Sequence, residues 1–82
     1  MASASPYQEL VEYIAKSLVD DPAMVDVHES EDRSGILLEL SVAEADMGRI
    51  IGRGGTLINS MRSLLQVLAG RHGKRVSLEL LS

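Results

Sequence analysis

The chain has 82 residues, of which 45% are hydrophobic and 2% aromatic, and its formal net charge is −4. A chain of this length forms one small domain with a two-layer, here aliphatic, core. It contains no cysteine, which excludes disulfides and thiolate metal sites and is compatible with a reducing cytoplasm. No apolar run approaches the length of a membrane-spanning helix, so we expect a cytoplasmic protein without membrane contact.

The charged residues are divided unevenly between the two halves of the chain. Residues 1–46 contain two basic and eleven acidic side chains, whereas residues 47–82 contain six basic and one acidic. An asymmetry of this size predicts one face that attracts anions and another that repels them. The anion-binding face is expected in the second half.

The first half predicts a helix followed by a hairpin. After a disordered tail over 1–6, apolar residues three and four positions apart predict an amphipathic helix over Tyr7–Val19. The alternating segments Val25–Glu29 and Ile36–Val42 predict two strands. A polar turn over Ser30–Gly35 joins them, so we expect an antiparallel pair.

The second half predicts two helices and a third strand. Ala43–Ile51 reads as a short helix that ends at the following glycine. A long helix runs from Leu57 to an expected C-cap at Gly70, with Thr56 as candidate N-cap. Arg75–Leu81 alternates as a strand. A helical crossover then favours a mixed three-stranded sheet with all three helices on one face, which makes an α+β domain.

The segment between the last two helices carries a pattern typical of phosphate binding. It reads Ile51-Gly52-Arg53-Gly54-Gly55. Glycines allow another backbone to approach closely, and the first turn of the next helix presents unpaired N–H groups. That combination suits a phosphate group. A dinucleotide loop would follow a strand, and a Walker loop would require G-K-[ST], so neither fits here.

This loop, in this order of elements, resembles the type II KH domain, whose signature I-G-x-x-G lies between two helices. The run from Gly48 to Arg62 is similar to the V-I-G-K-x-G-x-x-I-x-x-[IL]-R form of that family. The segment S-L-V-D-D-P ending at Pro22, and the strand R-V-S-L-E-L starting at Arg75, further resemble small bacterial single-KH proteins of the KhpA type. The resemblance implies a type II KH fold of order α-β-β-α-α-β, in one domain over 7–82.

In KH domains the glycine loop clamps the backbone of about four single-stranded nucleotides. The resemblance therefore implies a non-enzymatic protein that binds single-stranded RNA as an accessory RNA chaperone or post-transcriptional regulator. It also implies a homodimer or a complex with a second KH protein, and no cofactor or metal. The residues expected to contact RNA are Gly52, Arg53, Gly54, Gly55, Arg49, Ile51, Thr56, Ile58 and Arg62.

Two features add to or qualify this site. Gly54 occupies a variable position of the signature and gives three glycines in four residues, which predicts a flexible loop and weaker binding. Arg71, Lys74 and Arg75 are candidates for longer-range attraction of the same strand.

Other functions have less support. A protein-interaction module, with a basic partner on the acidic first helix and hairpin, stays open as an alternative. His28 and His72 lie far apart in the chain, and no serine has an evident base partner, so catalysis is not expected. The hairpin also carries four acidic residues, but they lack the ligand spacing of a calcium loop, so a metal site is not expected there. These residues are Asp26, Glu29, Glu31 and Asp32.

Overall fold

The computed structural model describes residues 5–81, and the first four residues of the predicted tail lie outside the described part. Helix α1 spans Pro6–Leu18, with Ser5 as its N-cap. The Ser5 side chain accepts a hydrogen bond from the amide of Gln8 at 3.1 Å, and Pro6 takes the first helical position, where its missing N–H has no cost. The last two residues of the segment predicted as tail are therefore the N-cap, Ser5, and the first residue, Pro6, of α1.

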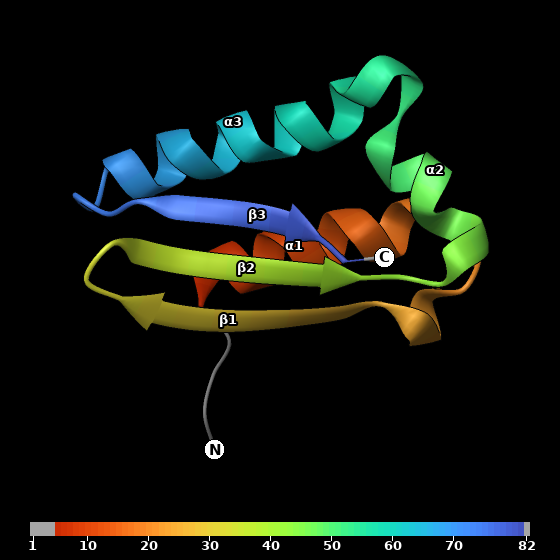
Figure 1. Ribbon diagram of the computed structural model, residues 1–82, viewed down its shortest axis with the longest axis horizontal. Helices are drawn as coiled ribbons and strands as arrows, with labels where there is room; N and C mark the ends of the chain where they lie inside the picture. Colours follow the sequence, from red (N-terminus) through yellow and green to blue (C-terminus); the bar gives the residue numbers. More distant parts are fainter. Residues whose placement is uncertain (1–4, 82) are drawn as a thin grey trace.

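The three strands form one mixed sheet in the order β1-β2-β3 (Figure 1). Strand β1 spans Asp26–Asp32 and pairs antiparallel with β2, Gly35–Ser41. Strand β3, Val76–Leu80, pairs parallel with β2, as the helical crossover predicts. The predicted turn over Ser30–Gly35 is too long. Residues 30–32 belong to β1, because cross-strand pairing continues as far as Asp32 opposite Gly35 although these polar residues lack hydrophobic alternation.

Helices cover one face of the sheet. In Figure 1, α1 lies behind the strands and the long helix α3, Thr56–Gly70, runs beside β3. Alternate residues of β2, including Leu38 and Leu40, are fully buried against these helices, together with Val11 of α1 and Leu65 of α3. The predicted helical stripes are thus confirmed as the core-facing sides, which is expected when burial of apolar surface sets the period. The exception is Leu64, which belongs to the predicted stripe of α3 but is 53% exposed.

The segment between β2 and α3 is built from short turns. A 3-10 turn over Glu44–Asp46 leads into helix α2, Met47–Ile51, so the single helix predicted over Ala43–Ile51 is divided. A further 3-10 turn over Arg53–Gly55 joins α2 to α3. The predicted C-cap of α3 is wrong by one residue, since the helix includes Gly70 and Arg71 is its C-cap.

Candidate nucleic-acid interface

The glycine loop has a defined backbone shape. Gly52 ends α2 with φ 76° and ψ 176°, and its N–H donates to the carbonyl of Gly48 at 3.0 Å. The N–H of Gly55 donates back to the carbonyl of Gly52 at 3.2 Å. Gly54, with φ 63° and ψ 20°, lies in the left-handed region that side chains rarely adopt. The backbone conformation of this position therefore favours a glycine at Gly54, in addition to the flexibility expected from composition.

Helix α3 begins without a side-chain cap. The prediction of Thr56 as N-cap is wrong, because Gly55 occupies that position and Thr56 is already helical, with φ −63°. The Thr56 hydroxyl donates instead to the carbonyl of Arg53 at 2.8 Å. Within residues 5–81 no side chain accepts from the first amides of α3 as a cap. These donors, and the positive end of the helix dipole, are left facing the loop, where an anion is favoured.

A buried carboxylate fixes the position of α2 and engages one of the predicted arginines. Asp46 is 2% exposed and accepts hydrogen bonds from the amides of Asp20 and Asp21 at 3.1 and 3.2 Å. Arg49 pairs with Asp20 at 2.9 Å and approaches Asp46 at 3.5 Å. Arg53, in contrast, is exposed and forms no ion pair within the described residues. Of these two arginines, Arg53 is the one whose charge is uncompensated.

The remaining predicted residues lie on the two helices that flank the loop, Ile51 on α2 and Ile58 and Arg62 on α3. Arg62 reaches from α3 to β3, where its Nε donates to the carbonyl of Leu78 at 3.1 Å. Its Nη1 donates to Oδ1 of Asn59 at 3.1 Å, which holds the guanidinium along the helix. Ile51 is 37% exposed beside the loop, whereas Ile58 is only 6% exposed. Ile58 therefore belongs to the core, and its side chain offers little surface to a ligand.

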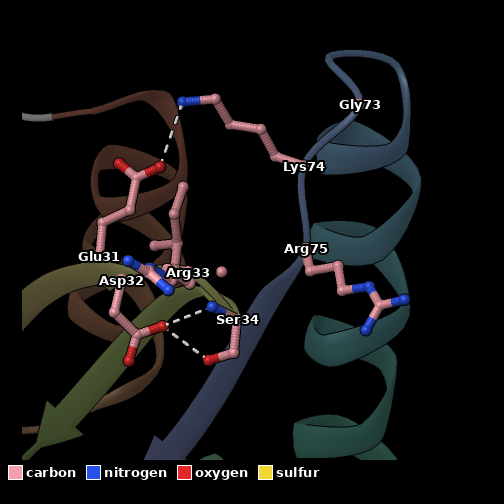
Figure 2. Close-up of a pocket in the computed structure, with 9 residues that line it drawn as sticks. Glu31, Asp32, Arg33, Ser34, Gly73, Lys74 and Arg75 are labelled. Atoms are coloured by element: carbon pink, nitrogen blue, oxygen red, sulfur yellow. Dashed lines mark hydrogen bonds and ion pairs between the residues drawn. The ribbon is translucent and has the colours of Figure 1, made fainter.

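The other basic side chains gather at the opposite end of α3. The hairpin turn and the α3–β3 connection meet there (Figure 1), and Figure 2 shows the side chains of this end. Lys74 reaches across to Glu31, with 3.6 Å between Nζ and Oε2, while Arg75 points the other way, toward α3 (Figure 2). The structure thus places Arg71, Lys74 and Arg75 far from the glycine loop.

The hairpin turn itself is held by an acidic residue. The carboxylate of Asp32 accepts hydrogen bonds from the hydroxyl of Ser34 at 2.6 Å and from its amide at 2.8 Å (Figure 2). These bonds, that from the hydroxyl first, lower the pKa of Asp32 below its ordinary value because they favour the charged form. Asp32 therefore stabilises the turn through its two hydrogen bonds from Ser34.

The two histidines lie in different environments. His28 stands opposite Glu39 in the β1–β2 register, on the face of the sheet that the helices leave open. The ring of His72 packs edge-on against Tyr7, with 6.4 Å between centroids. Within the described residues, no group of three or more acidic or histidine side chains is placed to hold a metal ion, and no helix is long and apolar enough to cross a membrane.

The order α1-β1-β2-α2-α3-β3, with an I-G-x-x-G loop between α2 and α3, is that of a type II KH domain. The family model described as "KhpA/KhpB, KH domain" matches residues 8–80. The chain belongs to the KhpA/KhpB family of KH domains.

Relatives and solved structures agree with this assignment. The chain is 42% identical over 73 residues to "RNA-binding protein KhpA" of Caldanaerobacter subterraneus subsp. tengcongensis, covering 89% of this chain and 97% of that protein. It is 45% identical over 74 residues to the protein of the same name from Chlamydia pneumoniae, covering 90% and 95%.

Among solved structures, the chain is similar to Era in complex with MgGDPNP and nucleotides 1506–1542 of 16S ribosomal RNA. The TM-score is 0.64 at 26% identity, and the match covers 90% of this chain but only 28% of Era. A variant of Aquifex aeolicus Era bound to GDP.AlF4- also matches, with a TM-score of 0.64 at 25% identity, over 98% of this chain and 32% of that one. The likeness therefore concerns one part of Era.

Proposed function

We propose that this chain is a non-enzymatic, single-stranded RNA-binding protein that grips the RNA backbone with the loop from Gly52 to Gly55. The observation that carries the proposal is the uncapped start of α3, which lies directly behind a tight glycine turn and the exposed Arg53. Its relatives are named RNA-binding proteins, and the Era structure contains ribosomal RNA. No relative reported above is named as an enzyme of RNA.

Each predicted residue has a physical role in this proposal. In the first turn of α3 the amide of Thr56 already donates to the carbonyl of Arg53, so the amides that follow it donate to phosphate oxygens, and the Arg53 fork pairs with the same group. Ile51 gives apolar surface to a base, whereas the buried Ile58 packs in the core and holds the start of α3 in place. Arg49 is expected to contribute least, because its charge is already matched by two carboxylates. Arg62 extends from α3 to β3, where its guanidinium bonds to the carbonyl of Leu78.

The test is a double substitution in the loop, Arg53→Asp and Gly54→Asp, assayed with a fluorescein-labelled RNA of four nucleotides by fluorescence anisotropy. A Cβ added at Gly54 meets no atom within 4 Å, and aspartate tolerates the left-handed region, so circular dichroism should stay unchanged. RNA binding should be lost. Undiminished RNA binding would overturn the loop assignment and would favour the alternative, a module that docks a basic protein on α1 and the hairpin.

A matched control exists at the other end of the molecule. Gly73 has φ 66° and, like Gly54, would meet no atom within 4 Å of an added Cβ. The double variant Arg33→Asp and Gly73→Asp makes the same charge change in the same backbone conformation, and it should retain binding of the short RNA.

Salt dependence gives a second test. With about three phosphates neutralised, the logarithm of affinity should fall with the logarithm of salt concentration with a slope of about −2. A slope near zero would contradict the proposal.

The biological setting is proposed from the family resemblance. We expect an accessory RNA chaperone or post-transcriptional regulator in the cytoplasm, where its proposed ligand is found. Crosslinking in cells, followed by sequencing of bound RNA, would identify the transcripts. Recovery of no RNA above background would contradict this role.

A homodimer, or a pair with a second KH protein, is also proposed. Leu64 and Val67, 53% and 66% exposed, form an apolar pair on α3 at helical spacing. Sedimentation velocity should show a dimer that Leu64→Lys with Val67→Lys converts to monomers. Monomeric wild-type protein at high micromolar concentration would contradict the homodimer and leave only the pair with a second protein.

A further inference from the structure

The edge of β3 that faces α3 carries backbone groups that do not pair with β2. The amide of Ile36 donates to the carbonyl of Arg75, and the amide of Leu81 donates to the carbonyl of Leu40, each at 2.8 Å. Backbone groups of a strand alternate in direction, so the amides and carbonyls of the odd-numbered residues of β3 point toward β2. The amides and carbonyls of the even-numbered residues then point to the opposite edge, along α3. The Arg62 bond to the carbonyl of Leu78 agrees with this direction.

A hollow of about 360 Å³ lies between the second half of α3 and the start of β3. It is lined by Gln66 of α3 and by Lys74, Arg75, Val76 and Ser77 at the start of β3. Figure 2 shows Arg75 directed toward α3, whereas Lys74 extends away to Glu31. Arg75 forms no ion pair within residues 5–81, so it is the uncompensated cation beside this hollow. The site therefore combines a free guanidinium, a side-chain amide and strand-edge backbone groups.

The spacing between the loop and the hollow matches a strand longer than the clamped segment. Ten residues of α3 separate Thr56 from Gln66, which corresponds to about 15 Å along the helix axis. At the spacing of about 3.4 Å per nucleotide along one strand of a duplex, four nucleotides cover about 14 Å. A strand that leaves the clamp along α3 would bring its fifth or sixth nucleotide to the hollow.

We propose that this hollow is a further RNA subsite, in which Arg75 binds a phosphate of the fifth or sixth nucleotide. Gln66 and the outward backbone groups of Val76 hold the adjoining sugar or base by hydrogen bonds. The subsite rests on the proposed function, because it assumes that the glycine loop holds the first four nucleotides. It makes the length of the RNA, and not only the loop, a determinant of affinity.

The test compares labelled oligouridylates of four and eight nucleotides by fluorescence anisotropy. Wild-type protein should bind the longer RNA more tightly. Arg75→Ala, and separately Gln66→Ala, should remove that gain and leave binding of the four-nucleotide RNA unchanged. For the longer RNA, the salt slope of Arg75→Ala should be shallower by about 0.7, the value for one phosphate contact of a single strand.

The control is Arg33→Ala, which removes an equal charge from the hairpin turn outside this hollow and should leave both affinities unchanged. Equal losses at both lengths in the Arg33 and Arg75 variants would show general charge attraction and overturn the subsite. Equal affinity of wild-type protein for both lengths would overturn it as well, while leaving the loop clamp intact. Failure of the proposed function has a different result, which is unchanged binding of both RNAs by the Arg53→Asp, Gly54→Asp variant.

Discussion

Replacing Gly52 by alanine tests whether the loop is held in one shape. An added Cβ would lie 2.6 Å from Cβ of Leu57 and 3.0 Å from its backbone nitrogen. The backbone of Gly52 also lies in a region that is essentially restricted to glycine, which costs on the order of 1–3 kcal/mol for other residues. The overlap with Leu57, which the start of α3 holds in place, adds about 1–3 kcal/mol.

The expected loss for Gly52→Ala is therefore about 2–6 kcal/mol of unfolding free energy, a large share of the roughly 5–15 kcal/mol that stabilises a small domain. Urea unfolding followed by circular dichroism measures it. Two other glycines give matched comparisons, because an added Cβ at Gly54 or Gly48 meets no atom within 4 Å. Gly54→Ala should lose only about 1–2 kcal/mol for its left-handed conformation. Gly48→Ala, inside α2, should gain about 0.5–1 kcal/mol.

The order of the three variants carries the argument. If Gly52→Ala were no more destabilising than Gly54→Ala, the overlap with Leu57 would be relieved by loop movement, and the loop would not be a fixed cradle. A loss of similar size in Gly48→Ala would show that α2 tolerates no change at all. Either result would refute the reasoning from loop geometry.

Three other substitutions test separate parts of the structure. Asp46→Asn should lower the unfolding free energy by about 1.5–3 kcal/mol, since the buried group loses its charge and one of its acceptor oxygens. Ser34→Ala should raise the lowered pKa of Asp32 toward its ordinary value in an NMR titration. In wild-type protein the stabilisation from Asp32 is present above the ordinary pKa and is lost as pH falls through the lowered one. Leu38→Ala, at a fully buried position of β2, should cost about 2–5 kcal/mol in urea unfolding.

Much of the fold could be predicted from the sequence because periodicity follows burial directly. The stripes of α1 and α3 were set by residues such as Val11 and Leu65, which the structure buries almost completely. The direction of β3 followed from chain geometry, since a helical crossover returns the strand parallel to β2. The family assignment likewise followed from the glycine loop lying between two helices.

The details around the loop could not be predicted, because they depend on contacts between distant residues. Nothing local marks Asp46 as buried, since its hydrogen-bond partners lie 25 and 26 positions earlier in the chain. The charge of Arg49 is compensated by Asp20 and Asp46 in the same network. The position of the N-cap was also missed, because threonine is a common capping residue, while the conformation of Gly55 is set by the turn before it.

The fold explains how a protein of net charge −4 can present a surface suited to RNA. The acidic half of the sequence forms α1, β1 and β2, and the basic half forms α3 and β3, so the sheet order separates the two charges in space. Two strand spacings of about 4.8 Å place β1 about 10 Å from β3. That separation is close to the Debye length of about 8 Å at physiological ionic strength. The carboxylates of β1 are therefore largely screened from the surface along α3, except Glu31, which pairs with Lys74 at 3.6 Å. In the proposed binding mode the arginines nearest the RNA are Arg53, Arg62 and Arg75, and we expect these three, and not the total charge of the chain, to determine its electrostatic attraction.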